Sequence, residues 1–186
     1  GGFSHSFATY LKRQDNTPLR AILWFRIKSL SNYIPQAVEL VSEVFADLDF
    51  SNRQRIREIV QREFAWSEHH IQSEGYNLAS SRVFSQLSRA GMINEYVNGA
   101  TAYLTLKKLD GDYDSQESKF IRKLEEIRDL IFRKQGLTIS MTGAEPEITR
   151  CKALCEKVHK SLADGSGQRV EPDFPTLPRN QAFCTA

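Results

Sequence analysis

Two stretches of this sequence carry residue types that bind metals or transfer protons. The first is Glu68-His69-His70, followed by Glu74. Two imidazoles bind one ion from a helix when they lie one turn apart, whereas adjacent helical positions point about 100° apart. Only His70 and Glu74 share a face. We therefore interpret this stretch as a solvated polar face of a helix rather than as a metal site.

The second stretch is Cys151, Cys155 and His159, spaced four residues apart near the end of the chain. Positions four apart drift around a straight helix by about 40° at each step, and no fourth ligand is evident. Free cysteine is among the most buried residue types. We interpret Cys151 and Cys155 as small side chains of a buried stripe. An enzyme or metal site on this Cys-Cys-His face is the alternative.

Other catalytic patterns are missing from the sequence, which has no P-loop, nucleophile elbow or Cys-x-x-Cys pair. Ser, His and Asp residues are present, but no spacing brings them together. Trp24 and Trp66 are interpreted as packing residues of a core or an interface rather than as a ligand platform.

Composition narrows the possible partners. The 186 residues carry 25 Lys and Arg against 23 Asp and Glu, a formal net charge of +2. The two signs are interleaved, so we expect no nucleic-acid partner. No apolar run approaches the roughly 18 residues of a membrane span, so we expect no membrane partner. Three cysteines without framework spacing indicate reduced thiols and favour an intracellular setting.

The strands are predicted from alternation. Residues 1–11 and 19–27 each read as a strand, and Asp15-Asn16-Thr17-Pro18 between them has turn chemistry. The two are expected to form an antiparallel hairpin. Residues 137–142 alternate again and predict a third strand, and residues 180–186 predict the start of another.

Helices are predicted between these strands. Ser31 or Asn32 is expected to cap the first helix, with Pro35 in its first turn. Ser51, with Gln54 three residues later, forms a capping-box pattern that opens a long helix.

The long helix is expected to break softly at residues 73–75 and to turn at residues 89–91 into one helix over 92–104. Ser115 is expected to cap a helix through Arg133, and a last helix ends near Leu162.

Each helix is expected to bury one apolar stripe. In the central stretch, residues 50–109, these stripe positions are Ile56, Ile59, Val60, Phe64, Ile71, Leu78, Arg82, Val83, Leu87, Met92, Ile93, Tyr96, Ala100, Tyr103 and Leu104.

A family resemblance is carried by a collinear series of short motifs. Ser-Glu-Gly-Tyr at 73–76 stands where Ser-Gly-His is usual, and Ala-Ser-Ser-Arg follows at 79–82. Leu-Ser-Arg-Ala-Gly at 87–91, Asn94-Glu95 and Asn-Gly-Ala-Thr-Ala-Tyr at 98–103 complete it. Over residues 1 to about 162, the chain resembles the third homologous domain of the presequence-protease branch of the pitrilysin/insulinase zinc metallopeptidases.

The resemblance implies a fold and a domain organisation. The expected fold class is α+β, with a small antiparallel sheet covered by about six helices and with its N-terminal strands missing. Residues 1–163 would form the metal-free domain, residues 164–180 a linker, and residues 181–186 the first strand of the next domain.

The resemblance also implies a function. The parent enzyme would hold zinc in its N-terminal half through His-x-x-Glu-His, a motif that this sequence lacks. This domain would have no catalytic or metal-binding residue and would enclose the peptide substrate together with the remaining domains. Alone, it is expected to hydrolyse nothing. The alternative from another class is a stand-alone α+β protein-interaction module.

One site residue follows from the resemblance. An arginine stands in the family at the place of Arg82, which implies a structural ion pair or a wall of the substrate chamber. A surface arginine that extends its charge into water is the alternative. Tyr76 departs from the family's usual histidine, so it is given no chemical role.

Overall fold

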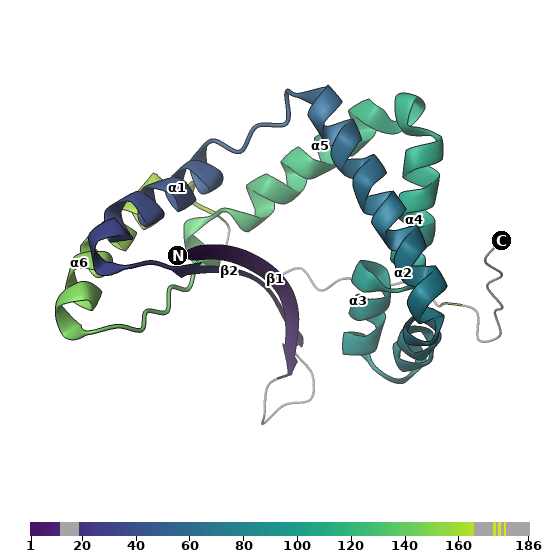
Figure 1. Cartoon of the computed structure of the whole chain (residues 1–186), viewed down its shortest axis with the longest axis horizontal. Helices are drawn as coiled ribbons and strands as arrows, with labels where there is room; N and C mark the ends of the chain where they lie inside the picture. The colour runs from purple at the N-terminus through teal and green to yellow at the C-terminus, as the bar shows by residue number, and fades with distance from the viewer. Residues whose placement is uncertain (12–18, 166–172, 174, 176, 178–186) are drawn as a thin grey trace. The chain divides into compact units, whose positions relative to one another are not determined.

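The computed structural model describes residues 1–11, 19–165, 173, 175 and 177 (Figure 1). These residues divide into two compact units. The first unit comprises residues 1–6, 24–51 and 118–170, and the second comprises residues 7–23, 52–117 and 171–186.

Two ten-residue strands form the sheet. β1 (Gly2–Leu11) and β2 (Leu19–Lys28) pair with each other in an antiparallel arrangement, as the alternation predicted. The predicted turn at residues 15–18 lies outside the described residues. A two-stranded sheet is marginally stable by itself, so this sheet depends on the helices that pack against it.

Aromatic rings hold the first unit together. The ring of Phe25 on β2 lies 5.2 Å from Phe45, and the ring of Phe45 lies 4.9 Å from Phe132, measured between centroids. Phe3 on β1 stacks on Phe25 at 6.0 Å. Edge-to-face and offset stacked contacts of this kind stabilise beyond simple area burial. The sheet therefore joins the helices of this unit through Phe25.

The predicted third strand is wrong. Residues 137–142 follow a short 3-10 turn, η2 (Lys134–Gly136), and have no regular secondary structure. Ile139, at the centre of the alternating run, is 41% exposed. An alternating pattern becomes a strand only where a neighbouring strand supplies backbone partners, and here none of the described residues does. The strand predicted at residues 180–186 lies outside the described residues.

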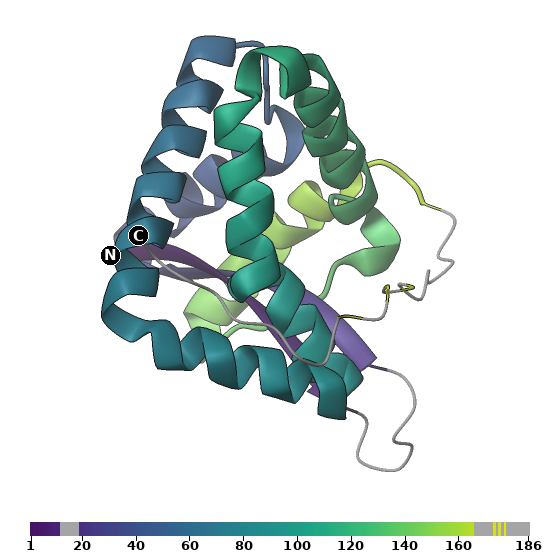
Figure 2. The same ribbon diagram turned by 90° about the vertical axis from the view of Figure 1, so that its right-hand side faces the viewer.

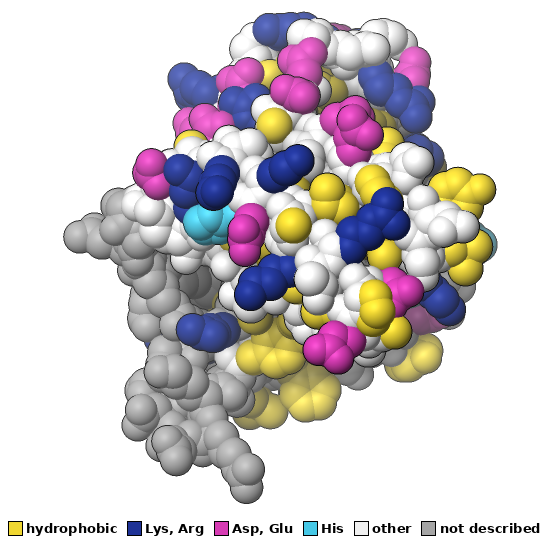
Figure 3. Space-filling view, turned by 90° about the vertical axis from the view of Figure 1, so that its left-hand side faces the viewer, with side chains coloured by type: hydrophobic (Ala, Val, Ile, Leu, Met, Phe, Trp, Pro, Cys, Tyr) yellow, Lys and Arg dark blue, Asp and Glu magenta, His cyan; other side chains and the backbone are white. Residues whose placement is uncertain are grey.

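The helices of the first unit are α1 (Ile34–Ala46) and α6 (Glu145–Ser161), which pack against each other. A 3-10 turn, Ser31–Tyr33, precedes α1, and neither Ser31 nor Asn32 caps it. Ser31 instead donates a hydrogen bond to Glu147 of α6 at 3.2 Å. Pro35 lies in the first turn of α1, as predicted. On the face shown in Figure 3, acidic and basic side chains are interleaved.

The long helix α2 (Arg53–Leu87) dominates the second unit. Its N-cap is Asn52, whose side-chain oxygen accepts a hydrogen bond from the amide of Arg55 at 3.0 Å. The predicted cap, Ser51, is therefore wrong. The hydroxyl of Ser51 binds Asp49, and this bond lowers the pKa of the Asp49 carboxyl. Asn and Ser cap equally well, so the sequence did not distinguish these neighbours.

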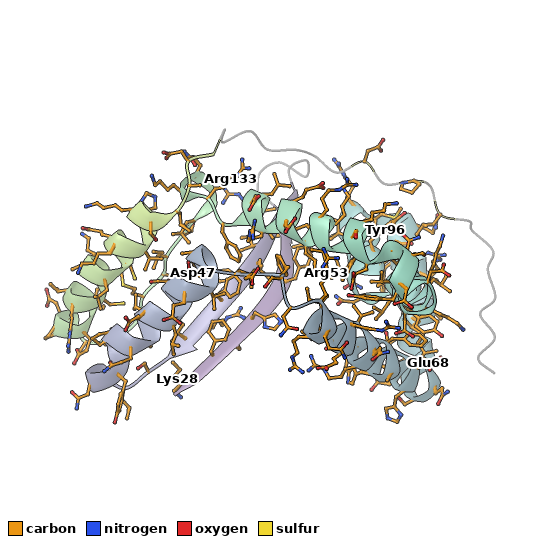
Figure 4. The ribbon with its side chains drawn as sticks, turned by 90° about the horizontal axis from the view of Figure 1, so that it is seen from above. Lys28, Asp47, Arg53, Glu68, Tyr96 and Arg133 are labelled. Atoms are coloured by element: carbon orange, nitrogen blue, oxygen red, sulfur yellow. The ribbon has the colours of Figure 1, made fainter. Side chains whose placement is uncertain are left out.

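The predicted soft break in α2 is confirmed. Glu74 has φ −132° and ψ 38°, outside the helical region, and the two halves of α2 meet there at an angle (Figure 2). Arg53 and Glu68 both lie on the first half (Figure 4). Arg53 pairs with Glu117 at 2.8 Å, which ties the start of α2 to the start of α5 (Tyr113–Ile131).

The helix predicted over residues 92–104 is two helices. α3 (Arg89–Asn98) and α4 (Ala100–Gly111) are separated at Gly99, and both pack against α2. The turn after α2 centres on Ser88, whose hydroxyl accepts from the amide of Gly91 and caps α3. The turn predicted at residues 89–91 is thus already helical. α5 likewise begins two residues before its predicted cap, Ser115.

The expected α+β fold class is confirmed, with two described strands in place of three. None of the helices in the described ranges is both long and apolar enough to cross a bilayer. The predicted boundaries at 163/164 and 180/181 stay predictions. Beyond residue 163 the structure describes only Asp164, Gly165, Asp173, Pro175 and Leu177.

Candidate functional site

Arg82 lies on the second half of α2, and its side chain is only 12% exposed. Its Nη1 donates to Glu95 Oε1 and to Thr101 Oγ1, each at 2.9 Å. Glu95 belongs to α3 and Thr101 to α4. One guanidinium therefore joins three helices, and the alternative of a surface arginine is wrong.

Glu95 is the centre of this cluster and has no exposed surface. Its Oε1 also accepts from the backbone amide and the hydroxyl of Thr101, each at 3.0 Å. Gly99, at the N-cap of α4, has no side chain to satisfy that amide. Glu95 therefore caps α4 from the preceding helix, and its negative charge lies at the positive end of the α4 dipole.

Gly99 provides the space that the Glu95 carboxylate occupies. A Cβ at position 99 would lie 2.0 Å from Glu95 Oε2 and 2.6 Å from its Cδ. Oε2 itself accepts no hydrogen bond from the described residues. Glycine is thus required here by close approach to a buried carboxylate rather than by an unusual φ.

Polar groups surround the cluster on the inner side of α2. The hydroxyl of Ser85 donates to the carbonyl oxygen of Arg82 at 2.7 Å, and Asn94 donates to Ser81 at 3.2 Å. Ser81 and Ser85 are both buried. A buried ion pair is tolerated only when its remaining donors and acceptors are satisfied. We name Arg82, Glu95, Gly99 and Thr101 the helix-junction cluster.

The helix-junction cluster holds structure rather than reacting groups. It has an acid and a guanidinium, but no nucleophile beside a base, which covalent catalysis requires. Sequence reasoning identified Arg82 and missed the roles of Glu95, Gly99 and Thr101. The available signal was an acidic residue, Glu95, directly between the stripe positions Ile93 and Tyr96.

The acidic and histidine stretch on α2 forms a single pair. His70 Nε2 lies 3.8 Å from Glu74 Oε2, and both side chains are partly exposed. The His70 ring stacks on Trp66 with centroids 5.3 Å apart. Trp66 is 64% exposed and, with Arg62 and Glu63, lines an open depression of about 270 Å³. Trp66 is thus not a core residue.

The two described cysteines form a thiol pair. Cys151 and Cys155 are half-buried on α6 with their Sγ atoms 3.8 Å apart, whereas His159 is exposed. Burial, together with the Cys151 contact, raises the pKa of Cys155 to about 11. A thiol ligates metal or attacks as its thiolate, so this pair is inert at neutral pH.

The described residues do not fit a zinc site. No group of three His, Cys, Asp or Glu side chains among them is arranged to hold a metal ion. His159 does not join the two thiols, and the pair of His70 and Glu74 has no third ligand. No catalytic step is therefore derived through zinc in this chain.

The fold and the helix-junction cluster define an α+β domain whose buried polar residues serve helix packing. Residues 1–109 match the family described as associated with the peptidases of metallopeptidase family 16, subfamily C. The match covers more than half of the chain, which belongs to this family.

Two curated proteins are similar over nearly the whole chain. "Protein HypA" of Clostridium perfringens (strain 13 / Type A) is 26% identical over 185 residues, which are 100% of this chain and 19% of that protein. "Presequence protease 1, chloroplastic/mitochondrial" of Arabidopsis thaliana is 25% identical over 184 residues, which are 98% of this chain and 17% of that protein. The chain thus spans under a fifth of each relative. The resemblance to the presequence-protease branch is confirmed.

Proposed function

We propose that this chain is a non-catalytic domain that encloses peptide in a zinc metalloendopeptidase acting on short, unstructured peptides. The observation that carries the proposal is the family match over residues 1–109, supported by a relative named as a presequence protease. In both relatives the matching region is one part of a much longer polypeptide. The remaining domains of the parent peptidase would be its partners, and zinc would lie in the N-terminal half.

Arg82 is assigned to the chamber wall as a positioning residue. Its guanidinium joins α2, α3 and α4 through Glu95 and Thr101 and leaves little of its own surface for a peptide. Three packed helices held by a buried ion pair form a rigid surface. A rigid wall would orient an extended peptide without touching the scissile bond.

An intracellular compartment is part of the proposal, either a bacterial cytoplasm or an organelle matrix. The relative named "chloroplastic/mitochondrial" supports it, as do the thiols of Cys151 and Cys155. Thiols persist where glutathione and thioredoxin keep proteins reduced.

The decisive experiment compares two proteins with a fluorogenic, unstructured peptide. One is the full product of the native coding sequence, and the other is the 186-residue chain with added zinc. We expect the full product to cleave the peptide, a chelator to stop it, and the chain alone to be inactive. Cleavage by the chain alone, or a full product without His-x-x-Glu-His and without activity, would overturn the proposal. The second result would favour the interaction module.

The role of Arg82 is tested in the full product by R82K. Lysine keeps the charge but cannot form the same two bonds to Glu95 and Thr101. A wall residue that positions peptide should raise KM more than it lowers kcat. A fall in kcat at constant KM would instead place Arg82 in the reacting centre and contradict the assignment.

A further inference from the structure

The second half of α2 exposes its apolar side chains. Tyr76 is 70% exposed, Val83 and Phe84 are each 60% exposed, and Leu87 is 72% exposed. A surface helix of a globular protein normally turns such a stripe toward the core. Val83 and Leu87 were expected to be buried, and the structure shows the opposite. We name these four residues the outer stripe.

The opposite side of the same half-helix is polar. Ser81, Arg82 and Ser85 face the packed interior of the second unit. Arg82 is the only charged residue between positions 76 and 87, and it points inward to Glu95. The half-helix is therefore inverted because its polar side is committed to the helix-junction cluster.

An uncharged apolar stripe restricts the chemistry of its occupant. At about 100° per residue, the four side chains fall within an arc of about 100°, which suits a single ridge of apolar side chains from a partner. A phosphate or an anionic lipid headgroup would find no cation on this stripe. Contiguous exposed apolar patches on soluble proteins mark interaction sites.

We propose that the outer stripe is the docking surface for another part of the parent polypeptide, outside these 186 residues. This inference rests on the proposed function, because it takes the chain to be one domain of a longer protein. The stripe is about 16 Å long at a rise of about 1.5 Å per residue. Free partners need about 800 Å² on each side for a stable complex, which four side chains do not provide.

A tethered partner needs much less area. Covalent linkage gives the second segment an effective concentration of about millimolar, so a short apolar stripe suffices to hold it. Both relatives are several times longer than this chain, which supplies such a tethered partner in each of them. A second copy of the chain has no comparable advantage.

The test uses the full product of the native coding sequence, with the photocrosslinker p-benzoylphenylalanine at position 87. We expect irradiation to give a crosslink at unchanged monomer mass, mapped by mass spectrometry to a residue outside this chain. Gln72, exposed on the first half of α2, is the control position. A crosslinked dimer, a crosslink to another polypeptide, or no crosslink above the level at position 72 would overturn the inference.

A paired variant checks that the stripe itself carries the contact. In the double variant F84K/L87K, with the crosslinker at position 76, we expect at least a tenfold loss of the internal crosslink. Both substituted side chains are exposed, so the melting temperature of the 186-residue chain should not change. An undiminished crosslink would contradict the proposal. The crosslink needs no peptidase activity, so an inactive product that still crosslinks overturns only the proposed function.

Discussion

Glu95 Oε1 lies 2.9 Å from Arg82 Nη1 and 3.0 Å from the amide of Thr101, on a carboxylate with no exposed surface. The same oxygen thus neutralises a charge on α2 and caps α4. Two functions of one atom make the residue hard to replace, because glutamine lacks the charge and aspartate lacks the reach. The junction of three helices depends on this position.

Glu95→Gln should destabilise the chain strongly. The substitution leaves the Arg82 guanidinium buried without a counter-charge, and breaking a buried pair on one side costs about 3–5 kcal/mol. Urea denaturation followed by circular dichroism measures the free energy of unfolding. The matched control is Glu58→Gln, which removes the exposed partner of Arg55 and should leave stability unchanged. Equal effects of both variants would contradict the role of Glu95.

Gly99→Ala and Gly75→Ala should act in opposite directions. A Cβ at position 99 would clash with Glu95, and such overpacking costs about 1–3 kcal/mol. A Cβ at position 75 meets nothing within 4 Å, so alanine there should stabilise α2 by about 0.5–1 kcal/mol. Thermal unfolding of the two variants distinguishes them. A neutral Gly99→Ala would show that the carboxylate can move aside.

Asn52→Ala and Ser51→Ala identify the cap of α2. Only Asn52 accepts the amide of Arg55, so its loss should cost about 1 kcal/mol in the free energy of unfolding. Ser51→Ala removes a bond to Asp49 outside the helix and should have the smaller effect. Denaturant titration of both variants gives the comparison. The reverse order would restore Ser51 as the cap.

Cys155 should resist alkylation until the solution is strongly basic. Its pKa is raised to about 11, against an ordinary value of 9.0, so the thiolate fraction at pH 8 falls about 100-fold on folding. Iodoacetamide labelling of a Cys184→Ser variant, mapped to peptides, should be correspondingly slower than in urea.

The same shift links the Cys155 thiol to stability. A raised folded-state pKa favours the folded state below about pH 9, and this contribution is lost as pH rises through about 11. The labelling rate should therefore rise about tenfold per pH unit across this window. Rapid labelling of folded protein at pH 8 would contradict the burial of this thiol.

Local signals in the sequence predicted most of the elements. The alternation of residues 19–27 gave β2, and the weak segment at residues 73–75 gave the break at Glu74. These features depend on side-chain periodicity and backbone preference within a few residues, which a sequence displays directly. The caps were less certain, because Ser51 and Asn52 are neighbours with equal preference.

Alternation over residues 137–142 and the apolar spacing of Val83 and Leu87 both misled, for one physical reason. A strand exists only beside another strand, and an apolar stripe is buried only if the helix turns that side inward. In α2 the orientation is set by Arg82, whose partner Glu95 lies on another helix. The sequence by itself determined the α+β class, the order of the helices and the family resemblance. Only the tertiary structure decided that Glu95 caps α4 and that the outer stripe faces solvent, because both follow from contacts between residues on different helices.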